Sequence, residues 1–150
     1  MDWFARAFIK SSLAWLGVGV TLGVCMAVEP ALTIYAPAHM HINLLGFVTM
    51  MIYGVAYHVL PRFTGHPLWS RRVPVWHWVA SNAGLAMMVV GIALRVHLQT
   101  VTAGTIVLSA GGTLSALGAY MFILNAWRTI DGKRLRHPAP SGDRMHRIAR

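Results

Sequence analysis

Residues 98–127 read LQTVTAGTIVLSAGGTLSALGAYMFILNAW, a run of thirty residues without one charged side chain. A helix needs roughly 20 mostly apolar residues to cross a bilayer, because each residue rises about 1.5 Å and the hydrocarbon core is about 30 Å thick. This segment exceeds that length. It therefore predicts a transmembrane helix that tilts within the bilayer.

Three earlier segments have the same character: residues 11–28, 38–60 and 73–94. The chain of 150 residues is 56% hydrophobic and only 11% charged, which is too apolar for a soluble domain of this size. Nearly all of the charge lies outside the four segments, which argues against a soluble helical bundle. We expect an all-α, four-transmembrane-helix bundle over residues 1–130 and a basic, flexible cytoplasmic tail over residues 131–150. The first segment has no small-residue cleavage site and runs into Glu29-Pro30, so it is not predicted to be a cleaved signal peptide.

Lysine and arginine placement predicts the orientation of these helices. The N-terminus, the segment between the second and third helices, and the C-terminal tail are basic, whereas the first loop has no basic residue and the third has only Arg95. We therefore expect an inner-membrane protein with both termini in the cytoplasm. The net charge of +9 is then mainly topological, and it favours anionic membrane lipid over nucleic acid as a partner.

Small residues at helical spacing predict close helix contacts. Gly19 and Gly23 form one such pair, and Gly111, Ser115 and Ala119 form a ladder. We interpret both as packing surfaces without chemistry, within one chain or between subunits. Cys25 is the only cysteine. No C-x-x-C-H motif is present, which excludes a covalent haem c.

Five of the eight histidines fall within or at the ends of the predicted spans, although ionisable groups in the membrane are costly. Their depths are paired: one group is expected near the outer surface and one near the inner surface. The outer group is His39, His41 and His97, and the inner group is His58 and His77. His41 and His58 are 17 residues apart, or about 25 Å along a helix axis.

Histidines that face one another between helices predict an axial ligand set for haem iron. Zinc is disfavoured because the spans contain no acidic residue and no cysteine accompanies the histidines. The alternative for each histidine is an interfacial side chain without a ligand.

One stretch of the sequence resembles a particular protein family. Residues 39–47, HMHINLLGF, and 52–62, IYGVAYHVLPR, resemble the tenth helix of the catalytic subunit of haem–copper oxidases, most closely the C-type oxidase and nitric oxide reductase branch. In that family the first histidine of the H-x-H pair ligates the high-spin haem and the second the low-spin haem. The resemblance thus implies these roles for His39 and His41. Two residues at 100° each point about 200° apart, as two such roles require.

The neighbouring helices resemble that family more loosely. The segment with residues 76–78, WHW, and Gly84 resembles the eleventh helix, and the last span the twelfth. Arg95 occupies the place where the family holds haem propionates with arginine, and the alternative is a snorkelling side chain. The helices that supply the copper ligands, and the one that supplies the second histidine of the low-spin haem, have no counterpart. We therefore expect no copper and no complete oxygen reductase.

The sequence thus predicts a membrane protein that holds one or two haem b groups. His41 with His97 is the favoured outer pair, although the implied role of His39 competes for it, and His58 with His77 is a weaker inner pair. His77 and His97 are 20 residues apart and point about 200° from each other, so one helix face does not serve both sites without tilt or a neighbouring subunit.

The expected function is electron transfer or the binding of NO or O2; any enzymatic activity would be that of a haem oxidoreductase. A quinol or a cytochrome would be the redox partner, with a homo-oligomer or a respiratory subunit around the chain. The main alternative is a haem-free accessory or assembly subunit of a respiratory complex. A small transporter is disfavoured because the spans lack acidic relay residues and helices broken by glycine or proline.

Overall fold

The computed structural model describes residues 1–97 and 101–132, and this part of the chain is helical without a strand. Four helical segments are long and apolar enough to cross a membrane, which confirms the predicted all-α architecture. In chain order the elements are α1 (Trp3–Val28), the 3-10 helix η1 (Pro30–Tyr35), α2 (Ala36–His41), the π-helix η2 (Ile42–Thr49), α3 (Met50–Thr64), α4 (Val73–His97) and α5 (Val101–Ile130). Residues 98–100 of the predicted fourth span, and residues 133–150 of the predicted tail, lie outside the described residues.

The second span is longer than predicted and is built from four elements. It runs from Pro30 to Thr64, whereas the sequence predicted residues 38–60. Its start is fixed by Glu29, whose carboxylate accepts a hydrogen bond from the Ala31 backbone N–H, with Pro30 at the first helical position. Within it, residues Ile42–Thr49 form a π-helix, and the Thr49 hydroxyl donates to the carbonyl of Leu44, five residues earlier, at 2.7 Å.

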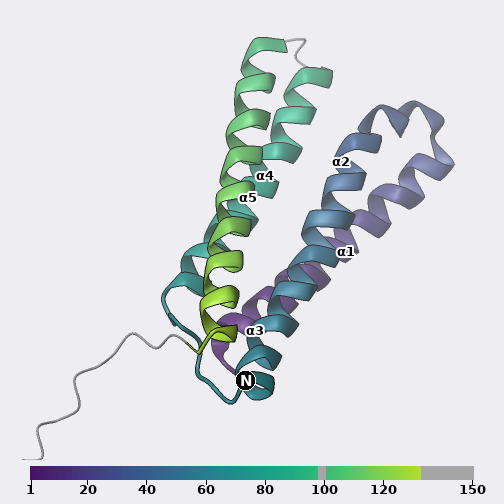
Figure 1. Ribbon diagram of the computed structural model, residues 1–150. Helices are drawn as coiled ribbons and strands as arrows, with labels where there is room; N and C mark the ends of the chain where they lie inside the picture. Colours follow the sequence, from purple (N-terminus) through teal and green to yellow (C-terminus); the bar gives the residue numbers. More distant parts are fainter. Residues whose placement is uncertain (98–100, 133–150) are drawn as a thin grey trace, which may run out of the picture.

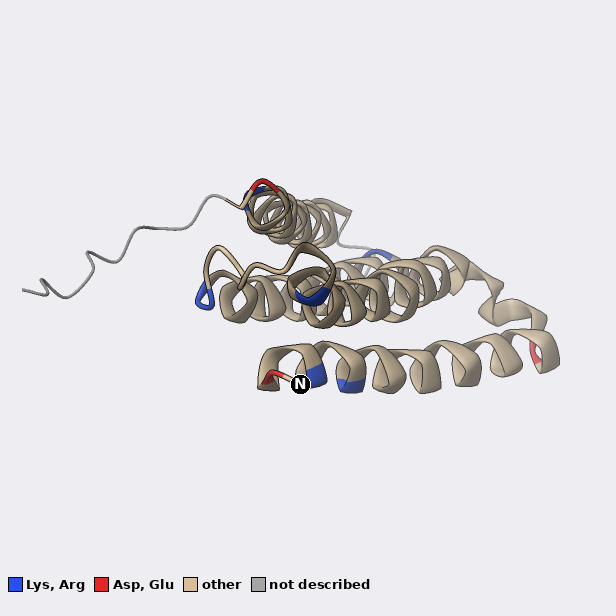
Figure 2. Cartoon of the chain, turned by 60° about the horizontal axis from the view of Figure 1, so that its bottom comes forward, with Lys and Arg blue, Asp and Glu red and all other residues tan. Residues whose placement is uncertain are grey.

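The four spans form two hairpins, α1 with α2–η2–α3 and α4 with α5 (Figure 1). The hairpins lie close together at the end that holds the N-terminus and separate toward the other end. Among the described residues, lysine and arginine gather at the first end (Figure 2), and Arg95, in the last turn of α4, is the exception near the second. We call these the basic end and the distal end. Two side-chain hydrogen bonds join α1 to α4: Trp15 Nε1 to Asn82 Oδ1, 3.1 Å, and Trp78 Nε1 to Ser11 Oγ, 3.0 Å.

Glycines bring the backbones of α4 and α5 into direct contact. A Cβ added to Gly111 would lie 2.6 Å from the carbonyl oxygen of Gly84 and 2.8 Å from the backbone nitrogen of Met88. Gly91 meets Gly104 in the same way one level nearer the distal end. The small-residue ladder on α5 therefore packs within the chain, as van der Waals contact between membrane helices requires.

The Gly19 and Gly23 pair serves a different purpose from the one predicted. These glycines of α1 do not pack against another backbone but make room for polar side chains of the second span. A Cβ at Gly23 would lie 2.9 Å from the Cε1 of His39, and Gly19 faces the side-chain amide of Asn43. The interpretation as a packing surface without polar chemistry is thus incomplete.

The buried core lies toward the basic end. Its members are large apolar or aromatic side chains from three of the four spans: Phe4, Ala5, Phe8, Met50, Tyr57 and Leu85. Phe8 and Tyr57 are fully buried, and their ring centroids lie 5.8 Å apart. This packing holds the two hairpins together where they meet.

Candidate functional site

His77 lies at the centre of the basic half of the bundle, and the protein encloses it completely. Its side chain is fully buried. The rings of Tyr53 and Phe8 lie nearest, with centroids 4.4 and 4.7 Å from the imidazole, and Tyr57 and Phe122 complete the enclosure at 5.8 and 5.9 Å. This packing leaves no space beside the ring for a flat cofactor.

Two polar contacts lie in this part of the core. The Asn125 side chain accepts from the Ser70 backbone N–H at 3.0 Å and donates to the Ser70 carbonyl at 3.2 Å. Separately, the Tyr57 hydroxyl lies 3.0 Å from Nδ1 of His77 and orients the imidazole. A phenol hydroxyl is a stronger hydrogen-bond donor than an imidazole N–H, and an imidazole nitrogen is a stronger acceptor than a phenol oxygen, so the hydroxyl donates to Nδ1. The proton of the neutral ring is then on Nε2, which has no hydrogen-bond partner among the described residues.

His58 does not join His77. Tyr57 faces His77, and the next residue along a helix points about 100° away from it. His58 instead lies with Arg62, whose guanidinium is 2.7 Å from a ring nitrogen and also donates to the His58 carbonyl at 2.8 Å. The two histidines predicted as an inner pair are therefore not brought together by the chain.

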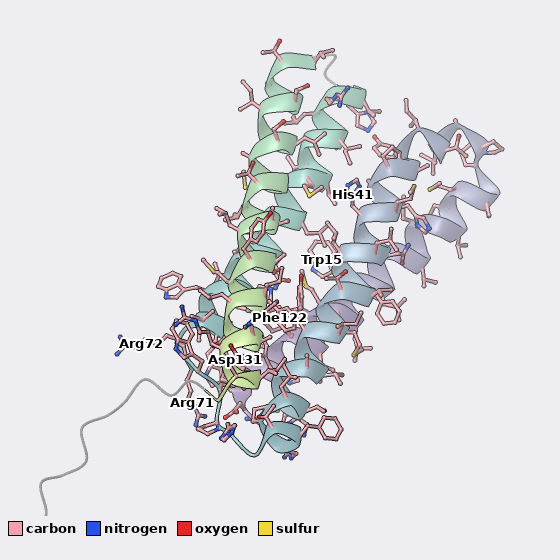
Figure 3. All side chains as sticks on the ribbon, viewed as in Figure 1. Trp15, His41, Arg71, Arg72, Phe122 and Asp131 are labelled. Atoms are coloured by element: carbon pink, nitrogen blue, oxygen red, sulfur yellow. The ribbon has the colours of Figure 1, made fainter. Side chains whose placement is uncertain are left out.

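His39 and His41 point in different directions, as the spacing predicted. His39 turns toward α1, where its ring lies over Gly23, and the Asn43 amide lies 3.1 Å from its Nε2. His41 lies on the side of α2 that faces the gap between the two hairpins (Figure 3). Both side chains are half-buried, and they differ in what they face: His39 packs against α1, and His41 lies on the side of the gap.

The backbone fixes the tautomer of His41. Its Nδ1 lies 2.6 Å from the carbonyl oxygen of Pro37. A carbonyl only accepts hydrogen bonds, so Nδ1 carries the proton and Nε2 holds the free lone pair. This is the arrangement in which a histidine ligates a metal: one nitrogen anchored to a carbonyl, the other available.

A cleft lies between the hairpins on the basic side of His41. Its volume is about 260 Å³, and its walls come from η2, α3, α4 and α5, including Leu45, Thr49, Tyr53, Ser81 and Gly112. His41 does not itself line this cleft, but Leu45, which does, follows it by one helical turn. For this proximity we call it the His41 cleft.

The two remaining predicted residues lie at the distal end of α4. His97 is exposed, and its Nε2 contacts the Tyr35 hydroxyl, with ring centroids 5.5 Å apart. Among the described residues, His97 forms no hydrogen bond or ring contact with His41. Arg95 is also exposed, and its aliphatic stem packs against Gly104 of α5.

A larger groove of about 770 Å³ opens among α1, η1, α2 and α4, with Tyr35 and Ala38 in its wall. Sequence reasoning did not find this groove, nor the contacts of Tyr57 with His77 and of Asn125 with Ser70. The only signal for the second contact was Asn125, an amide within an apolar run.

No group of three or more His, Cys, Asp or Glu side chains that could hold a metal ion occurs within residues 1–97 and 101–132. Haem iron needs fewer ligands from the protein, since the porphyrin supplies four donors and the protein supplies only one or two. No protein-family model, curated protein or solved structure matches the chain. The assignment of a site therefore rests on the geometry of the histidines.

Proposed function

We propose that this chain is a membrane haem-b protein that acts in electron transfer or in the binding of NO or O2, with His41 as the axial ligand. One observation carries this proposal: Nδ1 of His41 is anchored to the Pro37 carbonyl, Nε2 has no hydrogen-bond partner among the described residues, and the residue lies beside the gap between the hairpins. His39, His58 and His77 each have a ring engaged with neighbouring side chains. A haem b supplies a one-electron iron couple and, with an open axial position, a binding site for a diatomic gas.

The His41 cleft suits the edge of a porphyrin better than a whole one. Ligand pockets usually measure about 300–1,000 Å³, and this cleft holds about 260 Å³. The remainder of the ring would then face lipid or a second subunit. This favours a homo-oligomer or a respiratory partner subunit, because either would cover the exposed edge and could supply the opposite ligand that His97 does not provide within the described chain.

The enclosed position of His77 argues for one haem per chain and not two. A pyridine haemochrome assay on the purified protein should therefore give a ratio near one. A ratio near two haems per chain would instead support the predicted inner site at His58 and His77.

An optical spectrum of matched variants tests the ligand. His41→Ala should abolish or strongly lower the reduced b-type bands, since the axial donor is lost. His58→Ala is the control, because His58 lies at the basic end with Arg62, and it should keep the spectrum of the unaltered protein. Carbon monoxide would bind if the second axial position is open. Full haem content in His41→Ala would remove the proposed ligand.

A haem-free accessory or assembly subunit is the second candidate. It is favoured by the finding that no two of the described histidines face each other across a space for a cofactor. Absence of a Soret band from protein purified with haem supplied in the growth medium would support it.

We also propose that the basic end faces the cytoplasm of an inner membrane. The concentration of lysine and arginine at that end supports this orientation (Figure 2). Reporter fusions should place residues 29–37 outside and residues 61–73 inside. A cytoplasmic first loop would reverse the assignment.

A further inference from the structure

The 770 Å³ groove is long, and nearly all the side chains that line it are apolar. On α1 its wall runs from Ala14 to Cys25, eleven residues or about 16 Å of helix. Small residues form much of it, among them Gly17, Ala38 and Ala93. Such a surface suits a flexible apolar chain that lies along the helices. It does not suit a metal cofactor, since no histidine lines it.

The groove has one polar end. Tyr35 lines it at the distal end, and its hydroxyl meets Nε2 of His97. His97 follows Ala93 by one turn of α4, so both ring groups lie at the same mouth. Nδ1 of His97 has no hydrogen-bond partner among the described residues. The mouth therefore offers a hydroxyl and an imidazole, which both donate and accept hydrogen bonds.

The lining contains no charged residue. A phospholipid headgroup carries a phosphate, which is usually met by arginine or lysine. Arg95 precedes His97 by two residues and points about 200° away from it along the helix. The electrostatics of this mouth thus favour a headgroup that is neutral and carries hydrogen-bonding oxygens.

We infer that the groove binds an isoprenoid quinone or quinol, with a ring oxygen at Tyr35 and His97 and the tail along α1 and α4. The inference deepens the proposed function, since a quinol in the membrane is a source of electrons for a haem. Ala38 and Ile42 line the groove, and His41 lies between them in sequence on the same short stretch of helix. Leu45 and Thr49 of the same span line the His41 cleft, so the second span contributes to the walls of both spaces.

Two glycines allow each space to be filled separately. A Cβ added to Gly17, in the quinone groove, meets no atom within 4 Å, and the same holds for Gly112, in the His41 cleft. Gly17→Leu should fill the groove, and Gly112→Leu should fill the cleft. Because the first carbon of either side chain meets open space, we expect both changes to leave the helix backbones in place.

The experiment uses the full chain in nanodiscs of phosphatidylcholine, labelled with a photoreactive benzoquinone that carries a ten-carbon tail. We expect saturable labelling that unlabelled quinone displaces, and a loss of about tenfold or more in Gly17→Leu and in a Tyr35→Phe, His97→Ala double variant, which corresponds to one or two lost hydrogen bonds or blocked contacts. Gly112→Leu should keep the labelling. Unchanged labelling in Gly17→Leu, or displacement by phosphatidylglycerol as effective as that by quinone, would overturn the inference.

Haem content measured on the same samples separates this inference from the proposed function. Quinone labelling in a protein that lacks haem would reject the haem proposal and retain the quinone groove. A protein with haem whose labelling is not saturable would do the reverse.

Discussion

At the basic end of the bundle His77 is enclosed by four aromatic rings, whereas toward the distal end His41 faces a space between two separating hairpins. Both are imidazoles within membrane spans, and both have Nδ1 hydrogen-bonded. The difference lies in the partner of Nδ1 and in the surroundings of Nε2. A hydroxyl that donates to Nδ1 leaves the proton on Nε2, but a carbonyl that accepts from Nδ1 leaves Nε2 with a lone pair. Nε2 of His41 therefore has a lone pair that can coordinate a metal, whereas Nε2 of His77 carries a proton and cannot.

The strongest test of this comparison is removal of the enclosed ring. His77→Ala should destabilise the protein by about 2–3 kcal/mol, because the packing against four rings is lost and the Tyr57 hydroxyl is left without its acceptor. Unfolding in mixed micelles of increasing denaturing-detergent content measures the effect. His58→Ala, the control at the same end, should change stability by less than about 0.5 kcal/mol. Equal losses in the two variants would mean that enclosure does not distinguish them.

The contact between α4 and α5 can be broken without touching a histidine. Gly111→Ala should cost about 1–2 kcal/mol, since its Cβ would meet backbone atoms of α4. Gly112→Ala is a matched neighbour whose Cβ meets open space, and it should cost nothing measurable. The same unfolding assay compares them. A greater loss in the second variant would contradict the assigned helix faces.

A smaller effect is expected from the hydroxyl alone. Tyr57→Phe keeps the aromatic packing but removes the hydrogen bond to His77, which should cost about 1 kcal/mol. Tyr120→Phe changes a side chain that is 69% exposed and should leave stability unaltered. If Tyr57→Phe were neutral, the hydrogen bond from Tyr57 would not fix the tautomer of His77.

The smallest expected effect concerns the distal end. If the chain binds haem as proposed, Arg95→Ala should retain it and lower its reduction potential by about 20 mV, which corresponds to about 0.5 kcal/mol for one electron, because loss of a positive charge disfavours the electron-rich ferrous state and an exposed charge is screened. A redox titration followed in the visible range measures the shift. Arg128→Ala, at the basic end, should leave the potential unchanged, and an equal shift there would show that Arg95 has no local role.

The sequence was sufficient for the four spans, because a spanning helix is specified by length and apolarity, which residues 98–127 display directly. The opposite directions of His39 and His41 were also predictable, since α2 is regular where they lie. The expected depth of each histidine in the membrane was a weaker guide to which histidines lie together. His58 and His77 have similar depths, but Tyr57 and not His58 points at His77, and only the rotation of α3 against α4 decides this.

The polar contacts of this part of the core could not be predicted from the sequence for a related reason. Tyr57 of α3 meets His77 of α4, and Asn125 of α5 meets Ser70 of the segment before α4, so both contacts depend on how the helices pack. The relation of Gly19 and Gly23 to Asn43 and His39 is another example. A glycine pair indicates close approach, but not whether a backbone or an imidazole fills the space.

The π-helical turn at Ile42–Thr49 has a consequence for the phase of the second span. A π turn accommodates about one residue more than the α-helical repeat, and one residue corresponds to about 100° of rotation. Tyr53 and Tyr57 beyond it are held by the aromatic core, so the extra residue decides which way the H-x-H segment faces. Deletion of one residue from this turn would restore a continuous α-helix and rotate His39 and His41 together, away from Gly23 and from the gap between the hairpins. The direction of His41, the proposed ligand, therefore depends on the number of residues in this turn as much as on their identity.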